Sequence, residues 1–368
     1  MKFRAIVSWS LFALAAAAGA PALAAGQAIV IGQAIDLSGS NGSIGRDYVA
    51  GITTYFDSVN AKGGIKGKKI QYIVRDDRGD PAESARLVSE LIKQDRAVHL
   101  LGGIGAESTE AILAAPTFTQ TRQVLFAPLA DSFASQGGRV LFWRPGIEQE
   151  LRFLLGYFEK LGIKNIGVAY KQSAQNDKIY RFLLTEIGRR KMRLAGSANM
   201  SGTAAQNASQ VAALSKSGAK MVLTIADTTA SSVFLKAFRK LDSSTFVAGT
   251  SLINLQTLSQ IAGSKATAWT VFSQVVPNPE VAASPLQSEH IAMMRKFRDE
   301  PMSSMTLEGF AVAKTLVRAI ERDPAGYAGG QVKAIDLGGM SIVPGGQGGN
   351  LSQFVDIALL KQGGGLMY

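Results

Sequence analysis

The feature that most constrains the fold is a regular alternation of short apolar runs with longer stretches of helical periodicity. Residues 28–35 (AIVIGQAI) read as a buried strand, and Tyr48, Ile52 and Phe56 then recur at helical spacing. Residues 69–77 form a second strand candidate, followed by a helix start at Asp80. Strands that alternate with helices in this way predict a parallel sheet covered on both faces.

The same alternation restarts near Ile147. Residues 148–162 have helical periodicity, and apolar runs follow at 165–170 and 219–226. Two such runs predict an α/β protein with two doubly wound parallel-sheet lobes. The last part, 341–361, has the turn residues of hairpin strands.

The N-terminus has the layout of a secretory signal peptide. Lys2 and Arg4 precede an apolar run, and Ala22-Leu23-Ala24 gives a small-residue cleavage site. We therefore expect residues 1–24 to be a signal peptide and the mature chain to be a soluble periplasmic protein. The sequence has no cysteine, so a lipid anchor on cysteine, disulfides and thiol chemistry are excluded.

The charge and the motifs exclude several function classes. The net charge is +11, but basic residues cluster only at 62–69 and 189–193, without the interleaved aromatics of a nucleic-acid binder. Neither H-E-x-x-H, G-x-S-x-G nor a Walker motif occurs. His99 reads as a buried strand residue and His290 as a solvated one on a polar helix face. We expect no nucleic-acid partner, no enzyme activity, no metal and no cofactor.

The expected strand ends are rich in small polar residues. Open parallel sheets bind ligands outside the carboxyl ends of their strands. In LLGGIGAESTEA (100–111), G-x-G-x-x-S is an imperfect dinucleotide motif, and it follows the third strand rather than the first. A helix that begins near Glu107 would nevertheless direct free N–H groups toward a carboxylate or another acceptor. This loop therefore predicts binding and not nucleotide chemistry.

Five segments together resemble one known family. They are LSGSNGSIGRDYVAGITTYFDSVNAKGGIKGKKI (37–70), RDDRGDPAESARLVSELI (75–92), LFWRPGIEQE (141–150), SQVVPNP (273–279) and LEGFAVAKTLVRAI (307–320). In order and spacing they resemble the type I periplasmic solute-binding proteins, in particular the leucine/isoleucine/valine-binding branch that serves ABC importers.

The resemblance implies two lobes, joined by three crossovers, that close on a ligand. The crossovers are expected near Pro145, Pro277 and Ile342, with Gln274 also at the hinge. Lobe 1 is then 25–145 plus 277–341, and lobe 2 is 146–276 plus 342–368. The implied function is to deliver a small organic solute to a membrane permease, as a monomer. There are two alternatives. The chain is a ligand-sensing module for a membrane receptor, or it is a hydrolase or transferase on the same fold.

The resemblance also places a ligand site and shows where this chain departs from the family. Ala106 stands where amino-acid binders have a carboxylate-holding Ser or Thr, and Ser251 near their ammonium-holding acid. Ile44 and Ala174 stand where aromatics are common. The expected ligand-binding residues are Ser38, Asn41, Ile44, Gly105, Ala106, Ser108, Ala130, Asp131, Tyr170, Asp227, Thr228 and Ser251.

These departures predict a ligand other than a branched-chain amino acid. We expect a neutral, hydroxylated or amine-bearing solute, with Asp131 and Asp227 accepting its hydrogen bonds, because an unpaired buried carboxylate is costly. In the alternative interpretation, both Asp residues cap local turns and face water. Tyr170 is either an aromatic wall of the site or part of the packing at a strand end.

Overall fold

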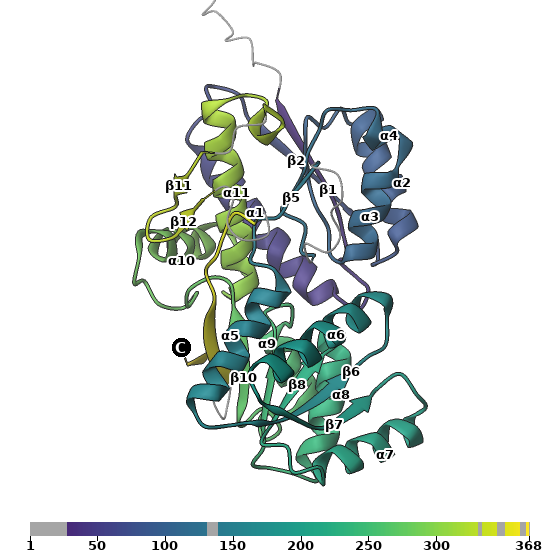
Figure 1. Ribbon diagram of the computed structural model, residues 1–368. Helices are drawn as coiled ribbons and strands as arrows, with labels where there is room; N and C mark the ends of the chain where they lie inside the picture. The colour runs from purple at the N-terminus through teal and green to yellow at the C-terminus, as the bar shows by residue number, and fades with distance from the viewer. Residues whose placement is uncertain (1–27, 131–138, 330–332, 344–349, 361–365, 368) are drawn as a thin grey trace, which may run out of the picture.

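The computed structural model describes residues 28–130, 139–329, 333–343, 350–360 and 366–367. Within these ranges the chain forms two α/β lobes, each built on its own sheet (Figure 1). The predicted signal peptide and Asp131 lie outside the described residues. The predicted fold class, two lobes built on parallel sheets, is confirmed.

The first lobe contains a five-stranded, fully parallel sheet in the order β2-β1-β3-β4-β5. Its strands are β1 (Ile29–Ile35), β2 (Ile70–Asp76), β3 (His99–Leu101), β4 (Leu125–Phe126) and β5 (Val140–Leu141). The helices between them are α1 (Gly42–Ala61), α2 (Pro81–Lys93), α3 (Ala106–Ala114) and α4 (Pro116–Thr119). Asp80 caps α2 and Pro81 opens it, as the sequence predicted.

Two helices from late in the sequence complete this lobe, α10 (Pro285–Phe297) and α11 (Ser304–Arg322). Helix α11 packs along α1 (Figure 1). A Cβ on Gly51 would lie 2.0 Å from the Thr306 carbonyl oxygen, and one on Gly309 would lie 2.1 Å from the Tyr48 carbonyl oxygen. The close approach of the two helix backbones therefore requires glycine at both positions.

The second lobe contains a seven-stranded sheet in the order β14-β13-β10-β9-β8-β6-β7. Its parallel strands are β6 (Asn165–Tyr170), β7 (Arg193–Asn199), β8 (Met221–Ile225), β9 (Phe246–Gly249) and β10 (Thr270–Gln274). The expected C-terminal hairpin supplies the antiparallel strands β13 (Asp356–Leu360) and β14 (Leu366–Met367).

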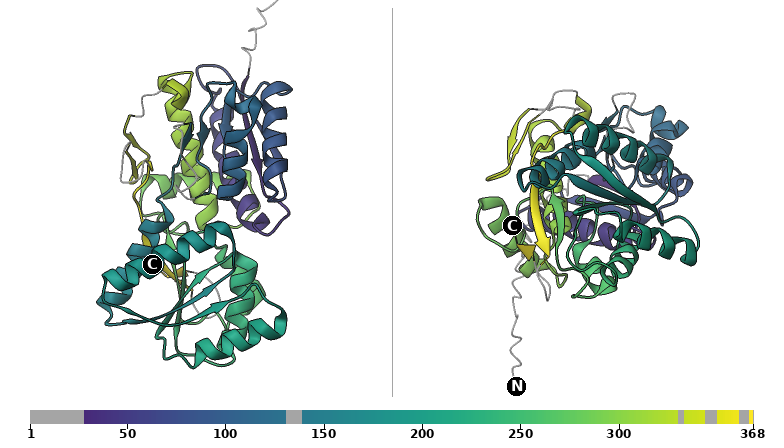
Figure 2. Two further views of the ribbon diagram at one scale, coloured as in Figure 1. Left: turned by 45° about the vertical axis from the view of Figure 1, so that its right-hand side comes forward. Right: turned by 60° about the horizontal axis from the view of Figure 1, so that its bottom comes forward.

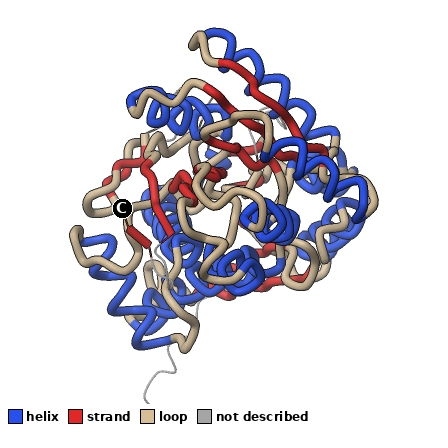
Figure 3. The backbone as a smooth tube through the Cα atoms, turned by 90° about the horizontal axis from the view of Figure 1, so that it is seen from below, coloured by secondary structure: helices blue, strands red, loops and turns tan. Residues whose placement is uncertain are grey.

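Five helices cover this second sheet, and apolar clusters fill the space on both of its faces. They are α5 (Ile147–Lys160), α6 (Ala174–Arg189), α7 (Ala204–Ser215), α8 (Thr228–Arg239) and α9 (Leu255–Ala262). Seen from below, helices lie on both sides of the central strands, while strands near the C-terminus lie at the edge of the molecule (Figure 3). None of the helices in the described part of the chain combines the length and apolarity needed to cross a bilayer.

The segments that connect one lobe to the other lie on one side of the molecule (Figure 2). Pro145 lies between β5 and α5, and Pro277 lies between β10 and α10. Ile342 lies in β12 (Ser341–Ile342), which pairs with β11 (Ile335–Asp336) after a short 3-10 helix (Gly326–Gly329). Beyond it, the Leu351 amide donates to the Phe142 carbonyl at 2.9 Å, so the last passage runs along the first.

The two histidines are both buried. His99 is 8% exposed, as predicted, and burial lowers its pKa to about 4. The expectation that His290 is solvated is wrong. Its side chain is fully buried and its Nε2 lies 3.1 Å from the Thr306 hydroxyl oxygen, because α10 packs against α1 and α11 rather than facing water. Burial lowers the pKa of His290 to about 4 as well.

Candidate ligand-binding site

A cavity of about 380 Å³ lies between the two lobes, at the carboxyl ends of strands from both sheets. We call it the interlobe cleft. On the first lobe it is lined by Ser40, Asn41, Ile44, Gly79, Pro81, residues 104–108 and Leu129. On the second it is lined by Ile147, Leu151, residues 171–173, Gln175, Asn176, Ile179, residues 224–227, Thr250 and Leu252. Its position is the one that the strand-end composition predicted.

The first lobe presents helix N-termini to the cleft. Helix α3 begins at Ala106, and none of the described side chains caps it. Gly105 precedes it with φ +99°, a conformation that favours glycine, and a Cβ there would meet nothing within 4 Å. Helix α1 likewise begins after Asn41 without a side-chain cap. The first N–H groups of α3 are therefore available to an acceptor on a ligand, whereas the Gly42 N–H at the start of α1 already donates to the Gly39 carbonyl at 3.1 Å.

The second lobe presents an ion pair to the cleft. The Lys171 ammonium lies 3.0 Å from Asp227 Oδ2. Asp227 Oδ1 accepts from the Ala230 amide at 2.8 Å, so this residue is the N-cap of α8. Asp227 therefore caps a local turn, as in the alternative interpretation of the sequence, and it also lines the cleft. Lys171 was not among the predicted residues, although its place directly after β6 was a usable signal.

Of the other predicted residues, Asn41, Ile44, Gly105, Ala106 and Ser108 line the cleft. Five described ones do not, namely Ser38, Ala130, Tyr170, Thr228 and Ser251.

Each of these five side chains has another contact. The Ser38 hydroxyl donates to Asp76 at 2.6 Å, and Ala130 packs with Ala106 and Phe142. Tyr170 stacks on Tyr180 with ring centroids 4.7 Å apart, which is the packing role left open by the sequence.

Thr228 and Ser251 are buried beneath the cleft wall. The Thr228 hydroxyl oxygen accepts from the Asn254 amide at 3.0 Å. The Ser251 hydroxyl accepts from Arg144, and its amide donates to Glu150 at 2.8 Å. Ser251 therefore belongs to a buried polar layer at the junction of the lobes rather than to the cleft surface.

We call Arg144, Glu150, Ser251, Ser273 and Glu308 the junction cluster. All five are at most 2% exposed, and Arg144 lies between the carboxylates, 3.9 Å from Glu150 and 3.6 Å from Glu308. Burial raises the pKa of Glu308 to about 7, opposed by Arg144 and assisted by Glu150. This cluster was not predicted from the sequence, because its members come from segments that are distant in the chain.

The rest of the cleft wall is mixed, with aliphatic side chains next to polar ones. The aliphatic side chains are Ile44, Ile104 and Leu129 from the first lobe and Ile147, Leu151, Ile179 and Leu252 from the second. The cleft thus combines acceptor-binding N–H groups, the Lys171–Asp227 ion pair, the Glu107 carboxylate, neutral polar side chains and aliphatic surface. This composition suits a small solute held by a few polar contacts. Among the described residues, no group of three or more His, Cys, Asp or Glu side chains could hold a metal.

The family model for periplasmic binding proteins matches residues 28–335 of this chain. The chain therefore belongs to the periplasmic binding protein family. Members of this family bind solutes, and the chain is a binding protein rather than an enzyme. The resemblance drawn from the five sequence segments is confirmed.

Solved structures show the same fold over nearly the whole chain. A substrate-binding periplasmic protein from Ralstonia solanacearum superposes with a TM-score of 0.83 at 23% identity, covering 92% of this chain and 99% of that one. The branched-chain amino acid transporter substrate binding protein LivJ from Streptococcus pneumoniae, solved with isoleucine, gives 0.79 at 16% identity, covering 93% and 98%.

One curated relative matches a shorter segment. An amino acid binding protein from Pseudomonas aeruginosa is 35% identical over 81 residues, which is 22% of this chain and 22% of that protein. The match therefore spans about a fifth of the relative.

Proposed function

We propose that the chain is the extracytoplasmic solute-binding subunit of an ABC importer. It binds a small, polar, amino-acid-like solute in the interlobe cleft and delivers it to a membrane permease from the periplasm. The observation that carries the proposal is the opposition, across one 380 Å³ cavity, of the uncapped α3 N-terminus and the Lys171–Asp227 pair. The likeness to binding proteins for amino acids supports the solute class.

An acceptor group on the solute, a carboxylate or a carbonyl, binds the first N–H groups of α3. The Ala106 side chain provides no hydroxyl, so the backbone and the partial positive charge of the helix N-terminus hold this group. Lys171 adds a positive charge from the opposite lobe. An amine or hydroxyl on the solute donates to Asp227 Oδ2. This oxygen, which contacts Lys171 in the structure, then accepts from the solute either together with Lys171 or in its place.

The site differs from one for a branched-chain amino acid in two respects. Ala106 lacks the carboxylate-holding hydroxyl, and Ser251 is buried against Arg144 where a carboxylate for the ammonium group is expected. A buried ammonium without an acceptor loses several kcal/mol of solvation. We therefore propose a solute whose polar groups reach Asp227 instead.

Ligand binding favours the closed arrangement, because only there does the solute contact both lobes. The lobe boundaries proposed from the sequence, with the hinge at Pro145, Gln274 and Pro277, place the junction cluster where the lobes rotate.

Isothermal titration with leucine, isoleucine and valine tests the assigned solute class. We expect no binding of any of the three in the micromolar range. Micromolar binding of one of them would contradict it. Genes for a permease and an ATPase next to this gene would favour import over sensing, and conversion of a bound solute would contradict a binding function altogether.

A further inference from the structure

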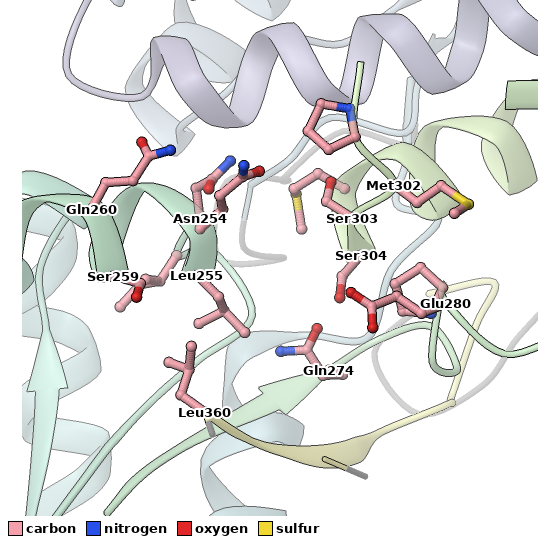
Figure 4. A pocket seen from close by; sticks show the side chains of 15 residues that line it. Asn254, Leu255, Ser259, Gln260, Gln274, Glu280, Met302, Ser303, Ser304 and Leu360 are labelled. Carbon is pink, nitrogen blue, oxygen red and sulfur yellow. The ribbon is translucent and has the colours of Figure 1, made fainter. Parts of the chain in front are cut away.

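A second cavity, of about 350 Å³, lies between the start of α9 in the second lobe and the segment that precedes α11 in the first (Figure 4). It is lined by residues 253–256, Ser259 and Gln260 at the start of α9, by Gln274 and Leu360 in the second sheet, and by 279–280 and 301–305. Among the described residues, its lining has no member in common with that of the interlobe cleft. It is therefore a separate space.

A hydrogen-bonded bridge borders this second cavity. Asp47 of α1 accepts from the Ser303 hydroxyl at 2.7 Å and from the Asn254 side-chain amide at 3.1 Å. Asn254 and Ser303 line the second cavity, whereas Asn41 and Ile44 of the α1 N-terminus line the cleft. The start of α1 thus contacts the walls of both spaces.

The walls of the second cavity are mainly apolar. Leu255, Leu360, Met302 and Met305 are among its lining residues, and Figure 4 shows the two leucines on the opposite side of the view from Met302. Methionine side chains are flexible and polarizable, so they adapt to ligands of different shape. An aliphatic chain or a small ring fits this chemistry better than a strongly hydrated solute does.

One polar atom in the cavity lacks a partner. Gln274 is 2% exposed, and its Nε2 donates to the Ser273 carbonyl at 2.7 Å. Its Oε1 is buried and has no hydrogen-bond partner among the described residues. The amide is directed into the cavity, beside Glu280 (Figure 4). A buried acceptor without a donor costs free energy that a ligand's donor group would restore.

We propose that this cavity is a second ligand site, for a small amphiphile with an apolar body and a hydrogen-bond-donating head. An amine or hydroxyl head donates to Gln274 Oε1, and the exposed Glu280 carboxylate favours the amine. The apolar body lies between Leu255, Met302 and Met305. A carboxylate head is disfavoured, because both Gln274 Oε1 and Glu280 are acceptors. The proposal stands independently of the solute bound in the cleft.

Methionine-methyl NMR tests the proposal with n-hexylamine as the probe. We expect saturable shifts of the Met302 and Met305 methyl signals, assigned with the variants Met302→Leu and Met305→Leu. The signal of Met221, which is fully buried in β8, should not move. n-Hexanol should give the same shifts, and hexanoate should bind at least about tenfold more weakly. The absence of saturable shifts with millimolar hexylamine would overturn the proposal, as would equal binding of hexanoate.

Two pairs of variants locate the probe. Ser259→Phe fills the cavity and should abolish the shifts, whereas Ser259→Ala leaves it open and should keep them. Gln274→Met removes the acceptor and should weaken hexylamine and hexanol about tenfold. Equal hexylamine affinity in Ser259→Phe and Ser259→Ala would overturn the assigned place. If Ser259→Phe does not fold by circular dichroism, Gln274→Met and the hexanoate comparison decide: unchanged affinity in Gln274→Met overturns the assigned head-group contact.

Discussion

The two lobes face the cleft in different ways. In the first lobe, α1 and α3 begin at the cleft without a side-chain cap. In the second lobe, α6 is capped by Ser173 and α8 by Asp227, so part of the donor capacity at these helix starts is already used. The first lobe therefore offers backbone donors, and the second offers Lys171 and Asp227. A solute that bridges the lobes needs both an acceptor and a donor group.

The largest expected effect comes from reversing the charge that the second lobe contributes. Lys171→Glu removes a cation from the cleft and places a carboxylate beside Asp227. We expect the affinity for the native solute to fall about 100-fold, or about 2.7 kcal/mol, by isothermal titration. Lys178→Glu is the matched control, because Lys178 is exposed and outside the cleft lining. Equal affinity losses in the two variants would remove Lys171 from the site.

The junction cluster, which both lobes share, is expected to be pH-sensitive. Glu308 has its pKa raised to about 7 by burial, so its protonated form stabilises the fold at low pH, and this stabilisation is lost as the pH rises through 7. Glu308→Gln should therefore gain stability relative to the native chain between pH 5 and pH 8, by on the order of 2 kcal/mol. His99 and His290, whose pKa values burial lowers from 6.5 to about 4, also change the stability within part of this window, but they are present in both proteins and their contribution cancels in the difference. Urea unfolding at several pH values measures the difference, and a pH-independent difference would contradict the assignment.

The backbone donors of the first lobe can be displaced through Gly105. Gly105→Ala forces a Cβ onto a residue with φ +99°, which strains the turn and moves the α3 N-terminus. We expect solute affinity to fall about tenfold. Gly162→Ala is the control, because Gly162 also has a positive φ, 76°, with nothing within 4 Å of its Cβ, but lies away from the cleft. A solute affinity in Gly105→Ala equal to that of the Gly162 control would show that the α3 start is not a contact.

The difference in helix capping between the lobes predicts a smaller effect, on the unfolding free energy rather than on solute affinity. Ser173→Ala removes the hydroxyl that accepts from the Asn176 amide at 3.1 Å and should cost about 1 kcal/mol of unfolding free energy. Asn41→Ala removes a side chain that makes no cap bond, so its cost should be smaller. Denaturant unfolding of the solute-free protein measures both. A larger cost for Asn41→Ala would reverse the comparison.

The fold followed from the sequence because hydrophobic periodicity is local. The 48–56 repeat and the Asp80-Pro81 start both identify helices without reference to distant residues. The position of the cleft followed as well, since Gly105 ends the loop after β3 and Ser108 lies in the first turn of the helix that follows. His290 was misjudged because the polarity of its own helix does not reveal that α1 and α11 cover it.

The junction cluster and the second cavity could not be predicted in the same way. Arg144, Glu150 and Glu308 meet only when the chain passes between the lobes, and their contacts join residues far apart in sequence. Gln274 was predicted at the hinge, but the orphaned Oε1 depends on how its amide is oriented. Lys171 follows β6 directly and could have been included by the strand-end rule.

Native mass spectrometry of the protein purified from its expression host tests the central claim most directly. We predict one small molecule per chain, released unchanged on unfolding, absent from Lys171→Glu and different from leucine, isoleucine and valine. A bound branched-chain amino acid, or equal occupancy in Lys171→Glu, would contradict the account.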